Sequence, residues 1–298
     1  MEKVVDCRGL SKIYRTGTVA LDDLDFKVEK GAIHGLVGRN GAGKTTLMKC
    51  LFNLIRPTSG TISVFGQAPG QMAHNVGGLI EMPAFYSHLS GEQNLLLFAG
   101  YFGVDSVECG RILELVGLAD RSRDKASRYS LGMKQRLGIA IALLGRPELL
   151  ILDEPVNGLD PQAIAETRDL IRTLRESGTT ILLSSHLLGE IEQVCDTVTV
   201  LESGKLVAEG TPEQLRQQFN GQAPFEFQVG DVAKASQLFV GIGVKVVVEG
   251  ESLLAYLPED LVASDLVRVL VKANVEVRSV KRRDSLEAAY LSMTQKEQ

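Results

Sequence analysis

The chain has 298 residues, of which 44% are hydrophobic and 23% charged, an ordinary balance for a globular protein with a sizeable core. Its length suits one large domain with a smaller one attached. The formal net charge of −5 leaves no basic excess to neutralise phosphates, which argues against broad nucleic-acid binding.

The sequence carries no sign of a disulfide framework or of membrane insertion. Its four cysteines are widely spaced and form no Cys-x-x-Cys pair, so we expect buried free thiols in a reducing compartment. The first residues, MEKVVDCRGL, lack the apolar core of a signal peptide. The densest apolar patch, residues 139–144, is far shorter than the ~18 residues that a membrane-spanning helix needs. We therefore expect a cytoplasmic protein.

The first two thirds of the chain alternate strand-like and helix-like segments. Expected strands cover residues 4–7, 24–28, 32–37, 61–65, 149–152, 181–183, 198–201 and 206–208. Expected helices cover residues 44–54 and 161–176, another begins at the capping pattern of Thr211, and residues from about 90 to 145 are mostly helical. This alternation predicts a largely parallel α/β sheet with a helical insertion.

The composition shifts near residues 220–224, which read NGQAP. Beyond this point, strands are expected over residues 225–229, 245–249, 253–257 and 275–280, and helices over residues 231–240 and 264–273. The order predicts a small α+β domain of the β-α-β-β-α-β type, ending in a helix over residues 285–293.

Residues 38–45 read GRNGAGKT and fit the phosphate-loop pattern G-x-x-x-x-G-K-[ST], between an apolar strand and a helical stretch. Glycines let backbone N–H groups converge on phosphate oxygens. Lys44 would reach the β- and γ-phosphates of ATP, the Thr45 hydroxyl would bind Mg²⁺, and Thr46 would contact the α-phosphate. The expected nucleotide contacts of this segment are Gly38, Asn40, Gly41, Gly43, Lys44, Thr45 and Thr46.

Residues 149–154 read LLILDE, an apolar strand that ends in two acids, where α/β folds place catalytic groups. We expect Asp153 to organise Mg²⁺ and Glu154 to polarise the attacking water. His186 follows the next strand, and this placement favours a γ-phosphate contact over a structural role. The other histidines, His34, His74 and His88, have no such setting and are expected to be structural or at the surface.

Taken together, these residues resemble the ATPase subunits of ABC transporters. Residues 129–136, YSLGMKQR, look like a degenerate form of the family signature Leu-Ser-Gly-Gly-Gln, in which Ser130 and Gly132 are retained. The resemblance covers about residues 3–218. It implies a P-loop NTPase fold of the ABC type over residues 1–220, with a helical subdomain at about 85–145. The small α+β accessory domain predicted from the order of elements then covers residues 221–298.

The resemblance also implies how the chain would work. ABC ATPases pair, and each ATP lies between the phosphate loop of one subunit and the signature of the other, so Ser130 and Gly132 would meet ATP in an ATP-dependent homodimer. Residues 157–160, NGLD, look like the D-loop that crosses this interface, which makes Asp160 a site residue. Tyr14 looks like the aromatic residue that stacks on adenine; a merely packed tyrosine is the alternative.

One departure from the family pattern concerns substrate. The family normally has a Gln after the strand that follows the phosphate-loop helix, and here residues 78–86 read GLIEMPAFY, with Glu81 in that place. A carboxylate keeps an oxygen ligand for Mg²⁺ or water but removes two donors. This Glu variant resembles the lantibiotic-immunity branch and its bacitracin-resistance relatives, which export antimicrobial peptides. A neutral substitution within a broader group of drug exporters is the alternative.

The resemblance thus implies an ATP-hydrolysing subunit on the inner face of the cell membrane. It would energise the export of a lantibiotic-type peptide through a separately encoded transmembrane permease. The peptide would bind to this permease and not to the ATPase subunit. A bacitracin or multidrug exporter is the alternative. A soluble ABC ATPase acting on ribosomes or DNA is disfavoured, because such proteins usually fuse two cassettes or carry a long coiled coil, and this chain has one phosphate loop and an acidic charge.

Overall fold

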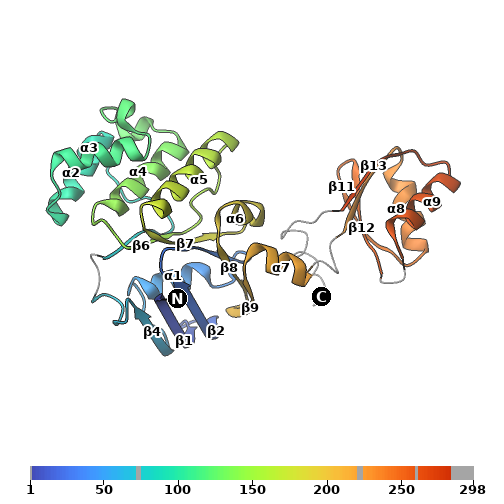
Figure 1. Cartoon of the computed structure of the whole chain (residues 1–298), viewed down its shortest axis with the longest axis horizontal. Coiled ribbons are helices and arrows are strands. Elements are labelled where there is room, and N and C mark those ends of the chain that lie inside the picture. Colours follow the sequence, from blue (N-terminus) through green and yellow to red (C-terminus); the bar gives the residue numbers. More distant parts are fainter. Residues whose placement is uncertain (1, 72–74, 220–223, 259–260, 283–298) are drawn as a thin grey trace. The chain divides into compact units, whose positions relative to one another are not determined.

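The computed structural model describes residues 2–71, 75–219, 224–258 and 261–282. The chain forms two compact units, Met1–Thr211 and Pro212–Gln298 (Figure 1). The helix expected over residues 285–293 lies outside the described residues. Among the described residues, none of the helices combines the length and apolar character needed to cross a bilayer.

A six-stranded sheet in the order β5-β6-β7-β3-β8-β9 organises the first unit. Its strands are β3 (Ile33–Val37), β5 (Val76–Leu79), β6 (Leu149–Leu152), β7 (Thr180–Ser185), β8 (Thr197–Glu202) and β9 (Lys205–Gly210). All neighbours pair in parallel except β8 and β9, which form an antiparallel hairpin. Strands β3, β6 and β7 are buried along their whole length, which explains their near-continuous apolar sequences.

A second, antiparallel sheet of the first unit has the order β2-β1-β4, with β1 (Lys3–Ile13), β2 (Val19–Glu29) and β4 (Ser59–Val64). Strand β1 is much longer than the expected residues 4–7. Its pairing with β2 shifts register after Cys7, and Gly9 adopts a positive φ of 57°. Such irregularities break the alternation of buried and exposed side chains, so the sequence pattern indicates only the first part of this strand.

Helix α1 (Lys44–Leu51) lies between the two sheets (Figure 1). Its apolar side chains Leu47, Met48 and Leu51 are buried in one cluster with residues of both sheets, including Phe26 and Leu182. Burial of this kind stabilises a helix of only 8 residues, which would be marginal in isolation. The packing fixes the helix N-terminus, and hence the phosphate loop before it, against the sheet.

The helical insertion between β5 and β6 holds α2 (Gly91–Phe102), α3 (Ser106–Leu115) and α4 (Leu131–Leu143), with short 3₁₀ turns at Ala119–Arg121 and Ala126–Arg128. Two further helices, α5 (Pro161–Glu176) and α6 (Leu188–Val194), follow β6 and β7. Helices α2 to α5 lie on the side of the six-stranded sheet away from α1 (Figure 1). The expected α/β fold with a helical insertion is confirmed.

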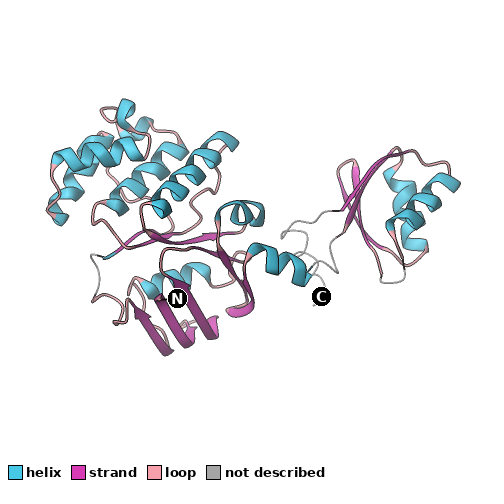
Figure 2. Cartoon of the chain, viewed as in Figure 1, coloured by secondary structure: helices cyan, strands magenta, loops and turns pink. Residues whose placement is uncertain are grey.

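The second unit begins with α7 (Pro212–Phe219), and its sheet has the order β11-β12-β10-β13 with antiparallel pairing throughout. Its elements are β10 (Phe225–Val229), α8 (Val232–Gly241), β11 (Lys245–Glu249), β12 (Ser252–Tyr256), α9 (Ala263–Lys272) and β13 (Val277–Arg282). Helices α8 and α9 cover one face of this sheet (Figure 2). The expected β-α-β-β-α-β order is confirmed.

Candidate functional site

The phosphate loop connects β3 to α1, and steric limits explain its glycines. A Cβ at position 38 would lie 2.4 Å from the carbonyl oxygen of Leu201, and one at position 43 would lie 2.5 Å from that of Ala20. Gly43 also has a φ of 108°, which side chains rarely allow. The loop thus keeps its backbone free of side chains where α1 begins, and the free N–H groups of a helix N-terminus attract phosphate.

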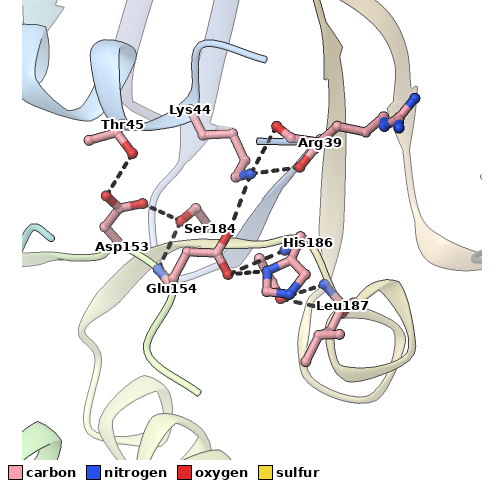
Figure 3. A network of polar contacts seen from close by, with 10 residues as sticks. Arg39, Lys44, Thr45, Asp153, Glu154, Ser184, His186 and Leu187 are labelled. Atoms are coloured by element: carbon pink, nitrogen blue, oxygen red, sulfur yellow. Dashed lines mark hydrogen bonds and ion pairs between the residues drawn. The ribbon is translucent and has the colours of Figure 1, made fainter. Parts of the chain in front are cut away.

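Lys44 is buried at the start of α1, with only 6% of its surface exposed. Its Nζ donates to the Gly38 carbonyl at 2.6 Å and to the Arg39 carbonyl at 3.4 Å, and it lies 3.3 Å from the Glu154 carboxylate (Figure 3). A buried ammonium needs such partners. The structure therefore brings the expected phosphate-binding lysine and the expected general base together.

Thr45 and Asp153 form an oxygen-rich pair beside Lys44 (Figure 3). The Thr45 hydroxyl donates to Asp153 Oδ2 at 2.8 Å, and the Ser184 hydroxyl donates to Asp153 Oδ1 at 2.5 Å. Asp153 is only 4% exposed, so its carboxylate is fixed by these bonds. A hydroxyl and a carboxylate are hard oxygen donors of the kind that Mg²⁺ prefers, and this donor set fits the ion.

Glu154 follows Asp153 in a left-handed conformation, with a φ of 50°. Its N–H donates to the Ser184 hydroxyl at 2.9 Å, which stabilises this uncommon backbone, and its Oε2 lies 2.7 Å from His186 Nδ1 (Figure 3). The carboxylate is thus flanked by an ammonium and an imidazole. This arrangement can polarise a water molecule and orient it.

Ser184 belongs to this network through its side chain, although the sequence assigns it no role. It bridges the two acids, because it donates to Asp153 and accepts from the backbone of Glu154. The available signal is its position at the carboxyl end of β7, next to β6 and just before His186.

Tyr14 lies beside the phosphate-loop helix. Its hydroxyl is 3.3 Å from the Thr46 hydroxyl, Lys12 Nζ lies 5.4 Å from its ring centroid, and 37% of its surface is exposed. The structure therefore places an accessible aromatic ring next to the loop, as stacking on a base requires. Asn40 and Gly41 are exposed in the same loop.

The residues expected to form the signature and the D-loop lie together, at the start of α4 and α5. Ser130 caps α4 by accepting from the Met133 N–H at 3.3 Å, and Asp160 caps α5 by accepting from the Ala163 N–H at 2.9 Å. A Cβ on Gly132 would lie 3.0 Å from that of Ala163, so the glycine permits close packing of the two helices. Within the described residues, no hydrogen bond or ion pair joins Ser130 or Asp160 to the phosphate loop.

Glu81 follows β5 and has a positive φ of 63°. Its Oε1 accepts from Lys49 Nζ at 2.6 Å, and its side chain is 61% exposed. The structure thus pairs Glu81 with Lys49 of α1, one helical turn after Thr45, and the role of Glu81 at Mg²⁺ stays a prediction.

The histidines other than His186 differ in burial. His34 is 2% exposed, and its ring nitrogens lie 2.8 and 2.9 Å from the hydroxyls of Thr197 and Thr199. Burial lowers the pKa of His34 to about 4, so the ring is neutral. His88 is exposed, and His74 lies outside the described residues. All four cysteines are free and buried, and burial raises the pKa of Cys7 to about 12.

A phosphate loop after the buried strand β3 and two acids at the end of β6, which β7 separates from β3 in a largely parallel sheet, define a nucleotide-hydrolysing P-loop protein. Residues 21–157 match the ABC transporter family. The chain is 46% identical to the bacitracin transport ATP-binding protein BcrA of Enterococcus faecalis over 78% of its length and 77% of that protein. The chain belongs to the ABC transporter family, as an ATP-binding subunit that couples ATP hydrolysis to transport.

Other relatives show how the match extends along the chain. The lantibiotic transport ATP-binding protein SrtF of Streptococcus pyogenes is 40% identical over 74% of this chain and 97% of its own length. The daunorubicin resistance ATP-binding protein DrrA3 of Streptomyces coeruleorubidus is 37% identical over 92% of this chain and 91% of its own length. A solved ATP-binding subunit of an ABC transporter superposes with a TM-score of 0.65 at 34% identity, covering 73% of this chain and 93% of that one.

Proposed function

We propose that this chain binds Mg²⁺·ATP and hydrolyses it to energise the export of antimicrobial peptides through a separate membrane permease. The observation that carries the proposal is the network around Glu154, in which one carboxylate contacts Lys44 and His186 while its neighbour Asp153 contacts Thr45. Mg²⁺ held by Thr45 and Asp153 would neutralise charge on the phosphates.

Each site residue has a defined task in this proposal. Glu154 accepts the proton of the attacking water, and His186 orients that carboxylate and contacts the γ-phosphate. Lys44 binds the β- and γ-phosphates, and Tyr14 stacks on the adenine. The loop residues Gly38, Asn40, Gly41, Gly43 and Thr46 surround the phosphates.

We further propose that two copies of the chain close on ATP. Ser130 and Asp160 lie at exposed helix starts without a contact to the phosphate loop in the described part of their own chain, which fits a role at the site of a second copy. The complex would sit on the inner face of the cell membrane, attached to a permease that recognises the peptide.

Two features bear on the class of the transported substrate: the residue at position 81 and the lengths of the relatives. Glu81 favours the lantibiotic-immunity type. The lengths of the relatives favour bacitracin as the second candidate, since SrtF is already matched over 97% of its length by 74% of this chain and leaves almost nothing to align with the second unit. The alignment with BcrA covers 77% of that protein and leaves the rest of it unaligned. The alignment with DrrA3 covers 92% of this chain, so that a drug exporter is the third candidate.

A resistance assay tests the proposal. A sensitive bacterium would express this chain together with the permease encoded beside it, and would be challenged with lantibiotics, bacitracin and daunorubicin; a Glu154→Gln version serves as the matched control. We expect resistance to one peptide class that disappears in Glu154→Gln. Resistance to daunorubicin alone would replace the peptide by a drug, and equal resistance in both strains would refute the role of Glu154.

A further inference from the structure

Helix α1 contacts two acids through side chains on one face. Thr45 and Lys49 are four residues apart, so they lie above one another, separated by about 6 Å along the helix axis. Thr45 donates to Asp153 after β6, and Lys49 donates to Glu81 after β5 at 2.6 Å. Strands β5 and β6 are parallel neighbours, and the Asp153 N–H donates to the Leu79 carbonyl at 2.8 Å. The two contacts are therefore adjacent.

The backbone at Glu81 adopts a conformation that its surroundings must maintain. The Met82 N–H donates to the Ile80 carbonyl at 2.8 Å, which closes a three-residue turn around Glu81, and the φ of Glu81 is 63°. A γ-turn with positive φ is rare and strained for a residue with a side chain. The Lys49–Glu81 ion pair is one of the contacts that hold this turn.

The ion pair is also easy to open. The side chains of Lys49 and Glu81 are 27% and 61% exposed, and ion pairs in contact with water are weak because both charges stay well solvated when separated. Opening of this ion pair would release the Glu81 carboxylate from Lys49.

We propose that Lys49 is a positioning residue that holds the Glu81 carboxylate one helical turn away from the Thr45–Asp153 pair. Glu81 then reaches the metal-binding pair only when its bond to Lys49 opens. The inference rests on the proposed binding of Mg²⁺ by Thr45 and Asp153. It assigns a role to Lys49, which neither the phosphate-loop pattern nor the strand-end acids include.

The test measures metal affinity in the full-length chain, without a permease. Mn²⁺ replaces Mg²⁺, a non-hydrolysable ATP analogue is present, and free Mn²⁺ is measured by electron paramagnetic resonance. We expect Lys49→Gln to bind Mn²⁺ roughly twofold to fivefold more tightly, the factor that the strength of an exposed ion pair allows. Lys49→Arg keeps the ion pair and should match the wild type.

Two comparisons separate this role from a general effect of charge. In a Glu81→Gln background, Lys49→Gln should change the Mn²⁺ affinity no further, because no carboxylate is left to release. Lys3→Gln removes another exposed lysine, whose Nζ lies 3.4 Å from Asp6, and should leave the affinity unchanged. Thermal unfolding of each variant, expected within about 2 °C of the wild type, excludes misfolding as the cause.

Unchanged Mn²⁺ affinity in Lys49→Gln would overturn the inference. So would an equal change in the wild-type and Glu81→Gln backgrounds, since Lys49 would then act on the nucleotide or the metal directly. The proposed transport function fails in a different experiment, through lack of resistance in cells that express the wild-type chain.

Discussion

The two units of this protein bury different kinds of side chain. In the described part of the chain, every buried polar or charged side chain lies in Met1–Thr211, among them Lys44, Asp153 and Ser184. The core of the second unit is apolar. Its Phe227 and Phe239 rings pack edge to face, with their centroids 5.1 Å apart. Buried polar groups cost stability unless they are hydrogen-bonded, and the candidate site with Lys44, Asp153 and Ser184 lies in the unit that carries this cost.

Backbone strain follows the same division. Glu81 and Glu154, both next to strand ends in the first unit, adopt positive φ values of 63° and 50°. Among the described residues of the second unit, the non-glycine residue with positive φ is Asn274, a type that tolerates this conformation. The first unit thus combines buried polar side chains with positive φ values near strand ends of the candidate site, whereas the second is a module packed around an apolar core. Four experiments test this division between the two units.

The largest expected effect is on catalysis in the first unit. Glu154→Gln should lower the rate of ATP hydrolysis by about 10²- to 10⁴-fold, because it removes the proposed general base, while ATP binding persists. Steady-state hydrolysis and binding of a fluorescent ATP analogue measure the two properties. A rate within threefold of the wild type would remove Glu154 from the mechanism.

A core substitution in the second unit should affect stability but not catalysis. Phe239→Ala deletes a fully buried ring and should lower the free energy of unfolding of the second unit by about 3–5 kcal/mol. The rate of ATP hydrolysis should stay unchanged at a temperature where the second unit remains folded. The neighbouring Val240, 59% exposed, gives the matched control Val240→Ala, with an expected change below about 0.5 kcal/mol. A large loss of hydrolysis in Phe239→Ala would contradict the division of roles.

The pH dependence of stability should come partly from His34. Because burial holds its pKa at about 4 in the folded chain, below the usual 6.5, only the unfolded chain takes up a proton as the pH falls below 6.5. The free energy of unfolding of the first unit should therefore drop by about 1.6 kcal/mol between pH 6.5 and pH 5 from this group alone. Urea unfolding of His34→Gln should show a shallower pH dependence, and His88→Gln, at an exposed site, should keep that of the wild type.

The smallest expected effect concerns nucleotide affinity. Tyr14→Ala should raise the dissociation constant for ATP about tenfold, because one aromatic–base stack is lost. Tyr14→Phe keeps the ring, loses only the contact with Thr46, and should change the affinity about twofold or less. Tyr101, 80% exposed in α2, gives the control Tyr101→Ala. Equal affinity in Tyr14→Ala and the wild type would show that the tyrosine only packs against the loop.

Local patterns in the sequence determined most of the elements and the core of the site. The glycine-rich loop, the acids after residues 149–152 and the capped start of α5 each depend on neighbours within a few residues, and so the sequence predicts them directly. The β-α-β-β-α-β order of the second unit follows from alternating segments in the same way. The sequence pattern does not predict the full length of β1, because register shifts interrupt the alternation of its buried and exposed side chains.

Which of these residues meet depends on the tertiary structure. The sheet order β5-β6-β7-β3-β8-β9 differs from the order along the chain, and it brings together the ends of strands that are far apart in sequence. That order sets Ser184 against Asp153 and Glu154, and Lys49 against Glu81. No local pattern encodes such pairs, since the contacts of Ser184 depend on the register of β6 and β7, and the contact of Lys49 depends on the burial of α1 between two sheets.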